Sequence, residues 1–277
     1  MKKVFLTLFA AVVNMAAMAQ FYVCKDGVVV YKIDDGVADS ITFTEPNFSK
    51  VTDLYHDGSE AGYNYVDLGL TSGTKWATAN VGAKTPQDYG NYYAWGETTT
   101  KETYNLSTYL DGNMSSYSDC GTDKDALKGV TDIAGTQYDA ARANWGGKWR
   151  MPTKVQQDEL INECYWVWTE NYNGSNAKGY IVYKAKTSSD KGQKIYKDGT
   201  PSSSYKLLDA HIFLPAAGYR GSGDLYGAGS DGDYWSSSLN TDYPGSAWSV
   251  SFDSDGVYGN GSGRGNGQSV RTVIPGE

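Results

Sequence analysis

The chain has 277 residues and a formal net charge of −8, from 24 Lys and Arg residues against 32 Asp and Glu residues. The basic residues form no cluster or stripe, which excludes nucleic acid from the expected partners because neutralised phosphates supply most of the affinity for DNA and RNA. The length suits one large domain with a small appendage. Three cysteines are too few for a scaffold built on disulfides.

The N-terminus has the pattern of an export signal. Lys2 and Lys3 precede an apolar run from Val4 to Val13, and Ala17-Met18-Ala19 matches a signal peptidase site. We expect residues 1–19 to be removed and the protein to be exported to the periplasm, the cell surface or the medium. Because the apolar run is far shorter than the ~20 residues of a membrane span, no transmembrane segment is expected in the mature chain.

Residues 20–44 are predicted to form a small β unit. Its segments are rich in β-branched and aromatic residues and are separated by Asp-Gly turns. These segments are Phe21–Val23, Val28–Ile33 and Ser40–Phe43. Three short strands are too small to be stable alone, so we expect the unit to dock on the main domain or to act as a spacer. Residues 45–61 are interpreted as a linker, and residues 62–277 as the main domain.

Two helices are expected in the main domain. Residues 138–144 are compatible with a short helix that Gly146-Gly147 ends. A second helix is predicted to begin at Thr153, whose hydroxyl can accept hydrogen bonds from the amides of the first turn. Its apolar residues are expected to face the core; they are Val155, Leu160, Ile161 and Cys164.

The rest of the domain is predicted to consist of loops and short strands. Between Glu97 and Val130 the chain is polar and weakly periodic, which is typical of a long surface loop. After Gly179 the pattern favours short strands at residues 180–183, 194–196, 212–214, 247–252 and 270–274. Two helices followed by many short strands predict an α+β domain.

The run from Asn144 to Thr153 carries two tryptophans and a double glycine, a composition too particular for a generic loop. We expect Trp145 and Trp149 to be buried in the core. Further motifs lie at residues 65–70, 88–97, 212–220, 234–238 and 264–271. In this order the motifs resemble the Fibrobacter succinogenes major paralogous domain of bacterial surface proteins, which is similar to the C-type lectin-like fold. The resemblance covers roughly residues 62 to 275 and implies a C-type lectin-like domain.

The sequence offers few candidate catalytic residues. His56 lies in the expected linker and His211 is the only histidine of the domain, so neither a Ser-His-Asp arrangement nor a two-histidine metal site is expected. Formylglycine-generating enzymes have a related fold, but they need cysteines late in the domain, where this chain has none after Cys164. We therefore predict no catalytic residue and no cofactor.

Metal binding is not expected either. Glu45-Pro46-Asn47 resembles the sugar-binding tripeptide of C-type lectins, but it lies in the expected linker. Asp231-Gly232-Asp233 and Asp253-Ser254-Asp255-Gly256 offer oxygen ligands without the full set that Ca²⁺ needs, and they are interpreted as turns. Two interpretations of the cysteines stay open: Cys120 and Cys164 form a disulfide, or both are free and partly buried thiols.

The segment from Ser230 to Gly267 has an unusual composition, since 28 of its 38 residues are Ser, Gly, Asp, Asn or Tyr. Tyrosine offers a large contact area at low entropic cost, while Ser, Gly and Asn offer adaptable hydrogen bonds, as in antibody paratopes. The lectin-like resemblance implies that this segment forms the ligand-facing surface. It is also similar to the variable region of proteins diversified by retroelements. A plain β region with many turns explains the composition equally well.

These observations predict an exported, non-enzymatic adhesion or binding module that recognises a protein or glycan on a cell or surface. The expected ligand-binding residues are Tyr226, Asp233, Tyr234, Trp235, Asn240, Tyr243, Trp248, Asp253, Asp255, Tyr258 and Asn260. We expect Arg220, Arg264 and Arg271 to tie loops to the core through fork-shaped hydrogen bonds.

Two other functions stay open. The chain could be a structural subunit of a surface or fimbrial assembly, to which the N-terminal β unit adds a strand. It could also be a glycan- or cell-wall-active enzyme, which would need paired carboxylates ~5 to 9.5 Å apart.

Overall fold

The computed structural model describes residues 21–25, 28–33, 54–110, 112 and 114–276. The chain divides into two compact units, Met1–Thr52 and Asp53–Glu277. In the first unit β1 (Phe21–Lys25) and β2 (Val28–Ile33) form an antiparallel pair. The signal sequence expected at residues 1–19 and the strand expected at residues 40–43 lie outside the described residues, as does Glu45-Pro46-Asn47.

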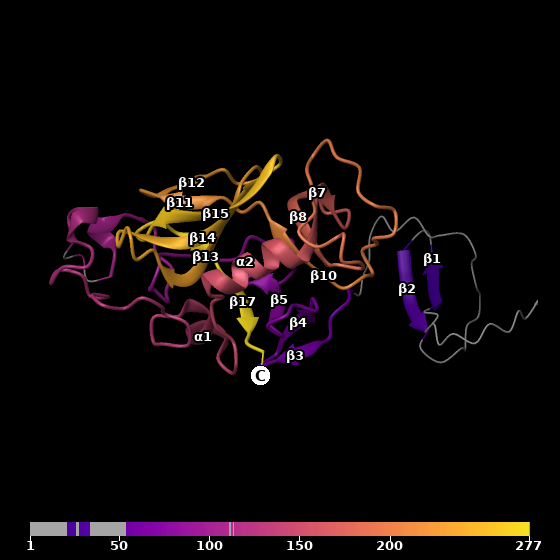
Figure 1. Ribbon diagram of the computed structural model, residues 1–277, viewed down its shortest axis with the longest axis horizontal. Helices are drawn as coiled ribbons and strands as arrows, with labels where there is room; N and C mark the ends of the chain where they lie inside the picture. The colour runs from indigo at the N-terminus through magenta and orange to yellow at the C-terminus, as the bar shows by residue number, and fades with distance from the viewer. Residues whose placement is uncertain (1–20, 26–27, 34–53, 111, 113, 277) are drawn as a thin grey trace, which may run out of the picture. The chain divides into compact units, whose positions relative to one another are not determined.

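The second unit, the main unit, is an α+β domain in which strands predominate (Figure 1). One sheet has the strand order β17-β5-β4-β3 and is antiparallel throughout. Its members are β3 (Gly58–Glu60), β4 (Tyr63–Asp67), β5 (Lys75–Asn80) and β17 (Arg271–Ile274). The first and last strands of the unit therefore belong to the same sheet.

Strand β3 corrects the expected linker at residues 45–61, because its residues belong to the main unit. It pairs with β4 across the turn Ala61-Gly62, where both residues have positive φ angles of 49° and 86°. That conformation suits a tight hairpin turn. The Trp149 Nε1–H also donates to the Glu60 carbonyl oxygen at 2.8 Å. Glycine and polar residues imitate a linker in the sequence, whereas their backbone pairing makes them part of the sheet.

A second sheet has the order β10-β8-β7-β9. Its members are β7 (Cys164–Tyr172), β8 (Ala177–Lys184), β9 (Lys194–Ile195) and β10 (His211–Pro215). The third sheet has the order β15-β14-β13-β16-β6. Its members are β6 (Tyr92–Tyr93), β13 (Gly232–Leu239), β14 (Ser246–Asp253), β15 (Gly256–Gly263) and β16 (Gln268–Ser269). A small hairpin, β11 (Tyr219–Gly221) and β12 (Asp224–Tyr226), connects the second and third sheets along the chain.

Both expected helices are confirmed. Helix α1 (Ala140–Trp145) is capped by the Asp139 side chain and ends at Gly146. Helix α2 (Lys154–Glu163) begins after Thr153, whose hydroxyl accepts from the Gln156 amide at 3.2 Å. Helix α2 lies between the third sheet and β7 (Figure 1). No helix of the described residues is long and apolar enough to cross a membrane.

The expectation that Val155 of α2 faces the core is wrong, because its side chain is 74% exposed. At 100° per residue, Val155 lies about 140° around the helix from the buried Leu160. Gln157 is buried instead, and its Nε2 donates to the Tyr234 carbonyl oxygen at 3.0 Å. A polar side chain thus connects α2 to the third sheet.

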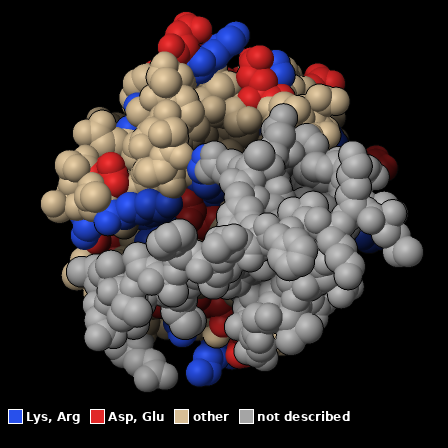
Figure 2. Space-filling model, turned by 90° about the vertical axis from the view of Figure 1, so that its right-hand side faces the viewer, with Lys and Arg blue, Asp and Glu red and all other residues tan. Residues whose placement is uncertain are grey.

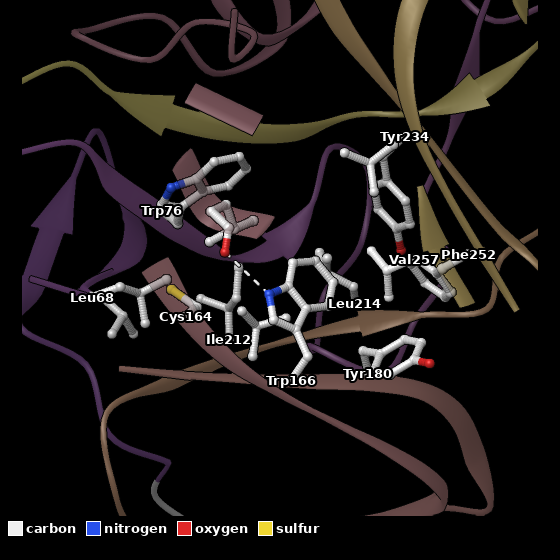
Figure 3. Close-up of a cluster of buried hydrophobic side chains, with 14 of the residues drawn as sticks. Leu68, Trp76, Cys164, Trp166, Tyr180, Ile212, Leu214, Tyr234, Phe252 and Val257 are labelled. Atoms are coloured by element: carbon white, nitrogen blue, oxygen red, sulfur yellow. Dashed lines mark hydrogen bonds between the residues drawn. The ribbon is translucent and has the colours of Figure 1, made fainter. Parts of the chain in front are cut away.

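The largest hydrophobic cluster lies where the three sheets and α2 meet (Figure 3). Trp76, Trp166 and Phe252 bring large aromatic surfaces from three different sheets. The Trp166 indole donates to the Leu160 carbonyl oxygen at 3.1 Å, which satisfies its polar atom. Cys164 belongs to this cluster.

Cys120 packs in another cluster, with its Sγ 3.7 Å from Met114 Sδ. Both Cys120 and Cys164 are buried free thiols, so the possible disulfide between them does not form.

On the face in Figure 2, basic and acidic side chains lie among one another over the described surface.

Candidate functional site

A buried ion pair supports the loops at one end of the third sheet. The Arg264 guanidinium donates to both carboxylate oxygens of Asp125, at 2.9 and 2.7 Å, and both side chains are almost fully buried. It also donates to the Pro244 carbonyl oxygen at 3.1 Å and, through Nε, to the Tyr109 hydroxyl at 3.1 Å. Arg264 thereby joins its own segment to the long polar loop, which carries Tyr109 and Asp125, and to the turn that carries Pro244.

The surroundings of this ion pair favour the charged forms of both side chains, because they lower the pKa of Asp125 and raise the pKa of Arg264. Burial alone would raise the pKa of Asp125, but hydrogen bonds from Arg264 and backbone amides outweigh burial and lower the pKa below its ordinary value. The guanidinium also lies over the rings of Trp95 and Tyr109, 5.3 Å from each centroid. An arginine held by four hydrogen bonds and an ion pair is a rigid support for the turn that it contacts.

The turn between β13 and β14 is held from both sides. The Asn240 side-chain oxygen accepts from the amides of Asp242 and Tyr243, and the Ser246 amide donates to the Tyr243 carbonyl oxygen at 2.8 Å. The Arg264 amide donates to the Gly245 carbonyl oxygen at 3.0 Å. With its backbone fixed in this way, Tyr243 presents a side chain that is 72% exposed.

Tyr117, from the long polar loop, lies against this turn. A Cβ atom at Gly263 would come within 2.3 Å of the Tyr117 hydroxyl, and one at Gly245 within 3.0 Å of the Tyr117 ring. The two glycines therefore leave the space that the Tyr117 ring occupies. The short 3₁₀ helix η2 (Tyr117–Asp119), capped by Ser116, positions this ring, and Tyr117 stays 46% exposed.

Together these segments enclose a pocket of about 550 Å³, which we call the loop pocket. Its size falls in the range of small-ligand sites. The loop pocket is lined by Tyr117, Asp242, Tyr243, Pro244, Gly245, Ser246, Gly263 and Asn266. It combines two exposed aromatic rings with a few polar groups on a rigid base.

Five of the expected ligand-binding residues are exposed at the surface. They are Tyr226, Tyr243, Asp255, Tyr258 and Asn260. Only Tyr243 of these lines the loop pocket. Tyr258 and Asn260 lie on the edge strand β15, while Tyr226 stacks on Tyr219 in the β11–β12 hairpin, with 5.3 Å between ring centroids.

Three expected residues are half-buried. The Asp233 carboxylate accepts from the Ser251 hydroxyl at 2.6 Å, and Trp248 lies under the Lys154 ammonium group of α2, 4.9 Å from the ring centroid. Asp253 accepts from the Asp255 amide in the β14–β15 turn, as expected for that motif. The turn expected at Asp231-Gly232-Asp233 is wrong, because Gly232 and Asp233 already belong to β13.

The expectation that Tyr234, Trp235 and Asn240 contact a ligand is wrong, because all three are buried. The Tyr234 hydroxyl donates to the Pro215 carbonyl oxygen at 2.7 Å, and the Trp235 indole donates to the Tyr93 carbonyl oxygen at 2.8 Å. Tyr234 and Trp235 are neighbours in β13 and point to opposite faces of the strand, so both faces are covered there. Tyr234 packs in the cluster of Trp76, and Trp235 packs in the cluster of Trp149.

Of the three arginines expected to tie loops to the core, two do so. Arg271 donates to Asn80 Oδ1 at 2.9 Å and to the Phe213 carbonyl oxygen at 2.7 Å, and Arg264 has the bonds given above. Arg220 differs, because its guanidinium makes no hydrogen bond or ion pair to any described residue. Its partner is the Tyr92 ring.

His211 is fully packed beside Tyr172, and His56 is exposed. Within the described ranges, no three His, Cys, Asp or Glu residues gather in a way that could hold a metal ion.

The sequence did not predict that four further residues line the loop pocket: Tyr117, Asp242, Pro244 and Asn266. Asp242 and Asn266 fall inside the Ser- and Gly-rich segment, so its composition was a usable signal for them. Tyr117 lies in the long polar loop, where no local pattern indicates its contact with Gly245 and Gly263.

Comparisons of the chain with protein-family models, curated proteins and solved structures returned no match. The function is therefore inferred from the geometry of the chain itself.

Proposed function

We propose that the main unit is a non-enzymatic binding module that takes a protein or glycan ligand at the loop pocket. The observation that carries this proposal is the pair of exposed tyrosines, Tyr117 and Tyr243, which line a pocket whose β13–β14 turn is held by the buried Arg264. Aromatic side chains held at a rigid concave surface are typical anchors of binding interfaces. Because the backbone that carries them is already ordered, binding a ligand costs little conformational entropy at this site.

The chemistry of the pocket favours binding over hydrolysis. Asp242 is the only carboxylate among the described residues that line the loop pocket. Glycoside hydrolysis ordinarily uses two carboxylates that flank the scissile bond. The Asp242 carboxylate and the Asn266 amide are suited to accept and donate hydrogen bonds to a ligand that the two tyrosine rings cover.

We further propose that this module belongs to the surface-protein family its motifs resemble, with a C-type lectin-like fold, and that it is exported to act on a cell or surface. The composition of residues 230–267 supports this proposal, since the turn that carries Tyr243 and the Gly263 wall both come from that segment. Under the same proposal, the segment tolerates diversification at its exposed positions, which include residues 241–243 and 258–261.

Variants at the two tyrosines test the binding site. We expect the parent protein, labelled with a fluorophore, to bind members of a glycan array or intact bacterial cells in flow cytometry. Replacing Tyr117 and Tyr243 together by Ala should abolish this binding, because a few aromatic anchors carry most of the energy of an interface. Folding should persist, since exposed side chains usually contribute within ~0.5 kcal/mol each to the free energy of unfolding.

The matched control replaces Tyr258 and Asn260 by Ala. These residues are also exposed and belong to the same Ser- and Gly-rich segment, but they do not line the loop pocket. We expect the control to bind as the parent does. Binding that survives in the Tyr117 and Tyr243 variant but is lost in the control would place the ligand on β15 and reject the loop pocket.

A further inference from the structure

A second pocket, of about 420 Å³, shares no lining residue with the loop pocket. Its walls come from the chain around β6, from residues 100–104 of the polar loop and from the β11–β12 hairpin. We call it the arginine pocket. Its polar lining includes Asn91, Thr100, Lys101, Glu102 and Arg220, and the Tyr92 ring forms part of its wall.

Hydrogen bonds fix these walls to one another. The Tyr104 hydroxyl donates to the Tyr92 carbonyl oxygen at 2.6 Å, and the Ser222 amide in the hairpin turn donates to the Tyr104 carbonyl oxygen at 2.8 Å. The Tyr92 hydroxyl donates to the Ala217 carbonyl oxygen at 2.6 Å, just before the hairpin. All three wall segments are thus ordered before any ligand arrives.

Arg220 is held in place without using its side-chain donors. Its amide donates to the Gly267 carbonyl oxygen at 2.7 Å, and its own carbonyl oxygen accepts from the Gly267 amide at 2.9 Å. The guanidinium lies over the Tyr92 ring, 5.3 Å from the centroid. In the described part of the chain, nothing accepts a hydrogen bond from this guanidinium, in contrast to those of Arg264 and Arg271.

The other cation in the pocket is already neutralised. The Lys101 ammonium group lies 2.8 Å from a Glu97 carboxylate oxygen and also donates to the Thr108 carbonyl oxygen. Arg220 is therefore the cation that stays available to a ligand. The exposed Glu102 and the side chains of Asn91 and Thr100 offer oxygen atoms that can accept hydrogen bonds from hydroxyl groups.

We propose that the arginine pocket binds a sugar acid, with the ligand carboxylate on the Arg220 guanidinium and the ring hydroxyls on the polar wall. The planar fork of arginine matches the two oxygens of a carboxylate, and stacking on Tyr92 keeps the plane of the fork in position. A pocket of about 420 Å³ has room for a single sugar ring. This site is separate from the loop pocket and does not depend on the function proposed for it.

Isothermal titration calorimetry on the full chain tests the proposal with sodium glucuronate, glucose and sodium acetate at constant ionic strength. We expect saturable binding of glucuronate, with glucose and acetate each at least about tenfold weaker, because glucose lacks the charge and acetate lacks the hydroxyls. Arg220→Gln should weaken glucuronate binding about tenfold or more. Arg220→Lys keeps the charge but lacks the fork, so it should also bind more weakly than the parent.

Arg142→Gln is the matched control, because it makes the same change of charge at an exposed residue of α1 outside the pocket. It should bind glucuronate as the parent does, and so should the variant that lacks Tyr117 and Tyr243. Absence of saturable glucuronate binding, or equal binding by the parent and both Arg220 variants, overturns the proposal. Glucose binding as tight as glucuronate binding, or acetate binding as tight, overturns it too.

Discussion

At the scale of single residues, His211 shows how burial sets the chemistry of a side chain. It is 3% exposed, and its Nδ1 lies 2.8 Å from the Asp209 carbonyl oxygen. A carbonyl oxygen only accepts, so Nδ1 carries the proton and Nε2 accepts from the Tyr172 hydroxyl at 2.9 Å. Burial lowers the pKa of His211 from 6.5 to about 4, so the imidazole is neutral in the folded protein.

The lowered pKa predicts a dependence of stability on pH. Between pH 6.5 and about 4 the unfolded chain binds a proton at His211 that the folded protein does not. The contribution of His211 to the free energy of unfolding should therefore be fully present above pH 6.5. It should fall as the pH drops, by at most about 1.4 kcal/mol per pH unit. Urea unfolding at pH 7, 6 and 5 measures the slope.

His211→Gln is the control for this slope, because its side chain can still form hydrogen bonds but does not titrate. We expect the variant to be less stable at pH 7 and to depend less on pH between 7 and 5. Parallel losses of stability in the parent and the variant would assign the pH dependence to other groups.

At the scale of secondary-structure elements, the run from Trp145 to Trp149 joins α1 to the first strands of the main unit. The Trp145 ring stacks on Tyr63 of β4, with 3.8 Å between centroids and an interplanar angle of 4°. It meets the edge of Trp149 at 5.2 Å between centroids. Since the Trp149 indole also donates to Glu60 of β3, the two tryptophans position the helix and the hairpin together.

Replacing either tryptophan by Ala should lower the free energy of unfolding by roughly 3 to 5 kcal/mol, because a large buried side chain leaves a cavity. Lys148→Ala lies between them at an exposed position and should change the free energy of unfolding by no more than about 0.5 kcal/mol. Thermal and urea unfolding of the three variants compare these effects. Unchanged stability in both tryptophan variants would contradict the packing described for this run.

At the scale of the whole molecule, the boundary of the main unit lies earlier than its sequence motifs indicate. Leu54 packs against the cluster of Tyr165 and Phe213, and Tyr55 packs against the cluster of Trp76 and Trp166. Strand β3 then completes the sheet that also contains β17. Residues 54–61 are therefore expected to contribute to the stability of the main unit.

Two truncated chains test this boundary. A chain of residues 54–277 should keep the melting temperature that the main unit has in the full protein, because it retains β3 and the apolar contacts of residues 54 and 55. A chain of residues 62–277 should melt at a lower temperature, because it loses β3 and leaves the buried Trp149 indole without its acceptor. Equal melting temperatures for the two chains would show that β3 contributes nothing to stability.

Local signals in the sequence determined the class of the fold and several of its elements. The Thr153 cap, the glycine end of α1 and the alternating pattern of β14 depend on a few neighbouring residues, so they could be predicted without tertiary contacts. Strands β13 and β15 were not predicted, because they contain Gly, Asp and Asn, which have low strand propensity, and because the pairing with β14 stabilises them. Strand β3 was missed for the same reason, because its short Gly-Ser-Glu sequence does not favour a strand and its pairing with β4 stabilises it.

The composition of residues 230–267 pointed to the region of the candidate site, but tertiary structure decided which residues face a ligand. Tyr243 and Tyr234 look equivalent in the sequence, yet one is 72% exposed and the other 2%. The loop pocket depends on the ion pair of Arg264 with Asp125, residues that lie 139 positions apart. Contacts over such distances form only when the sheets assemble, because no local periodicity or cap encodes them.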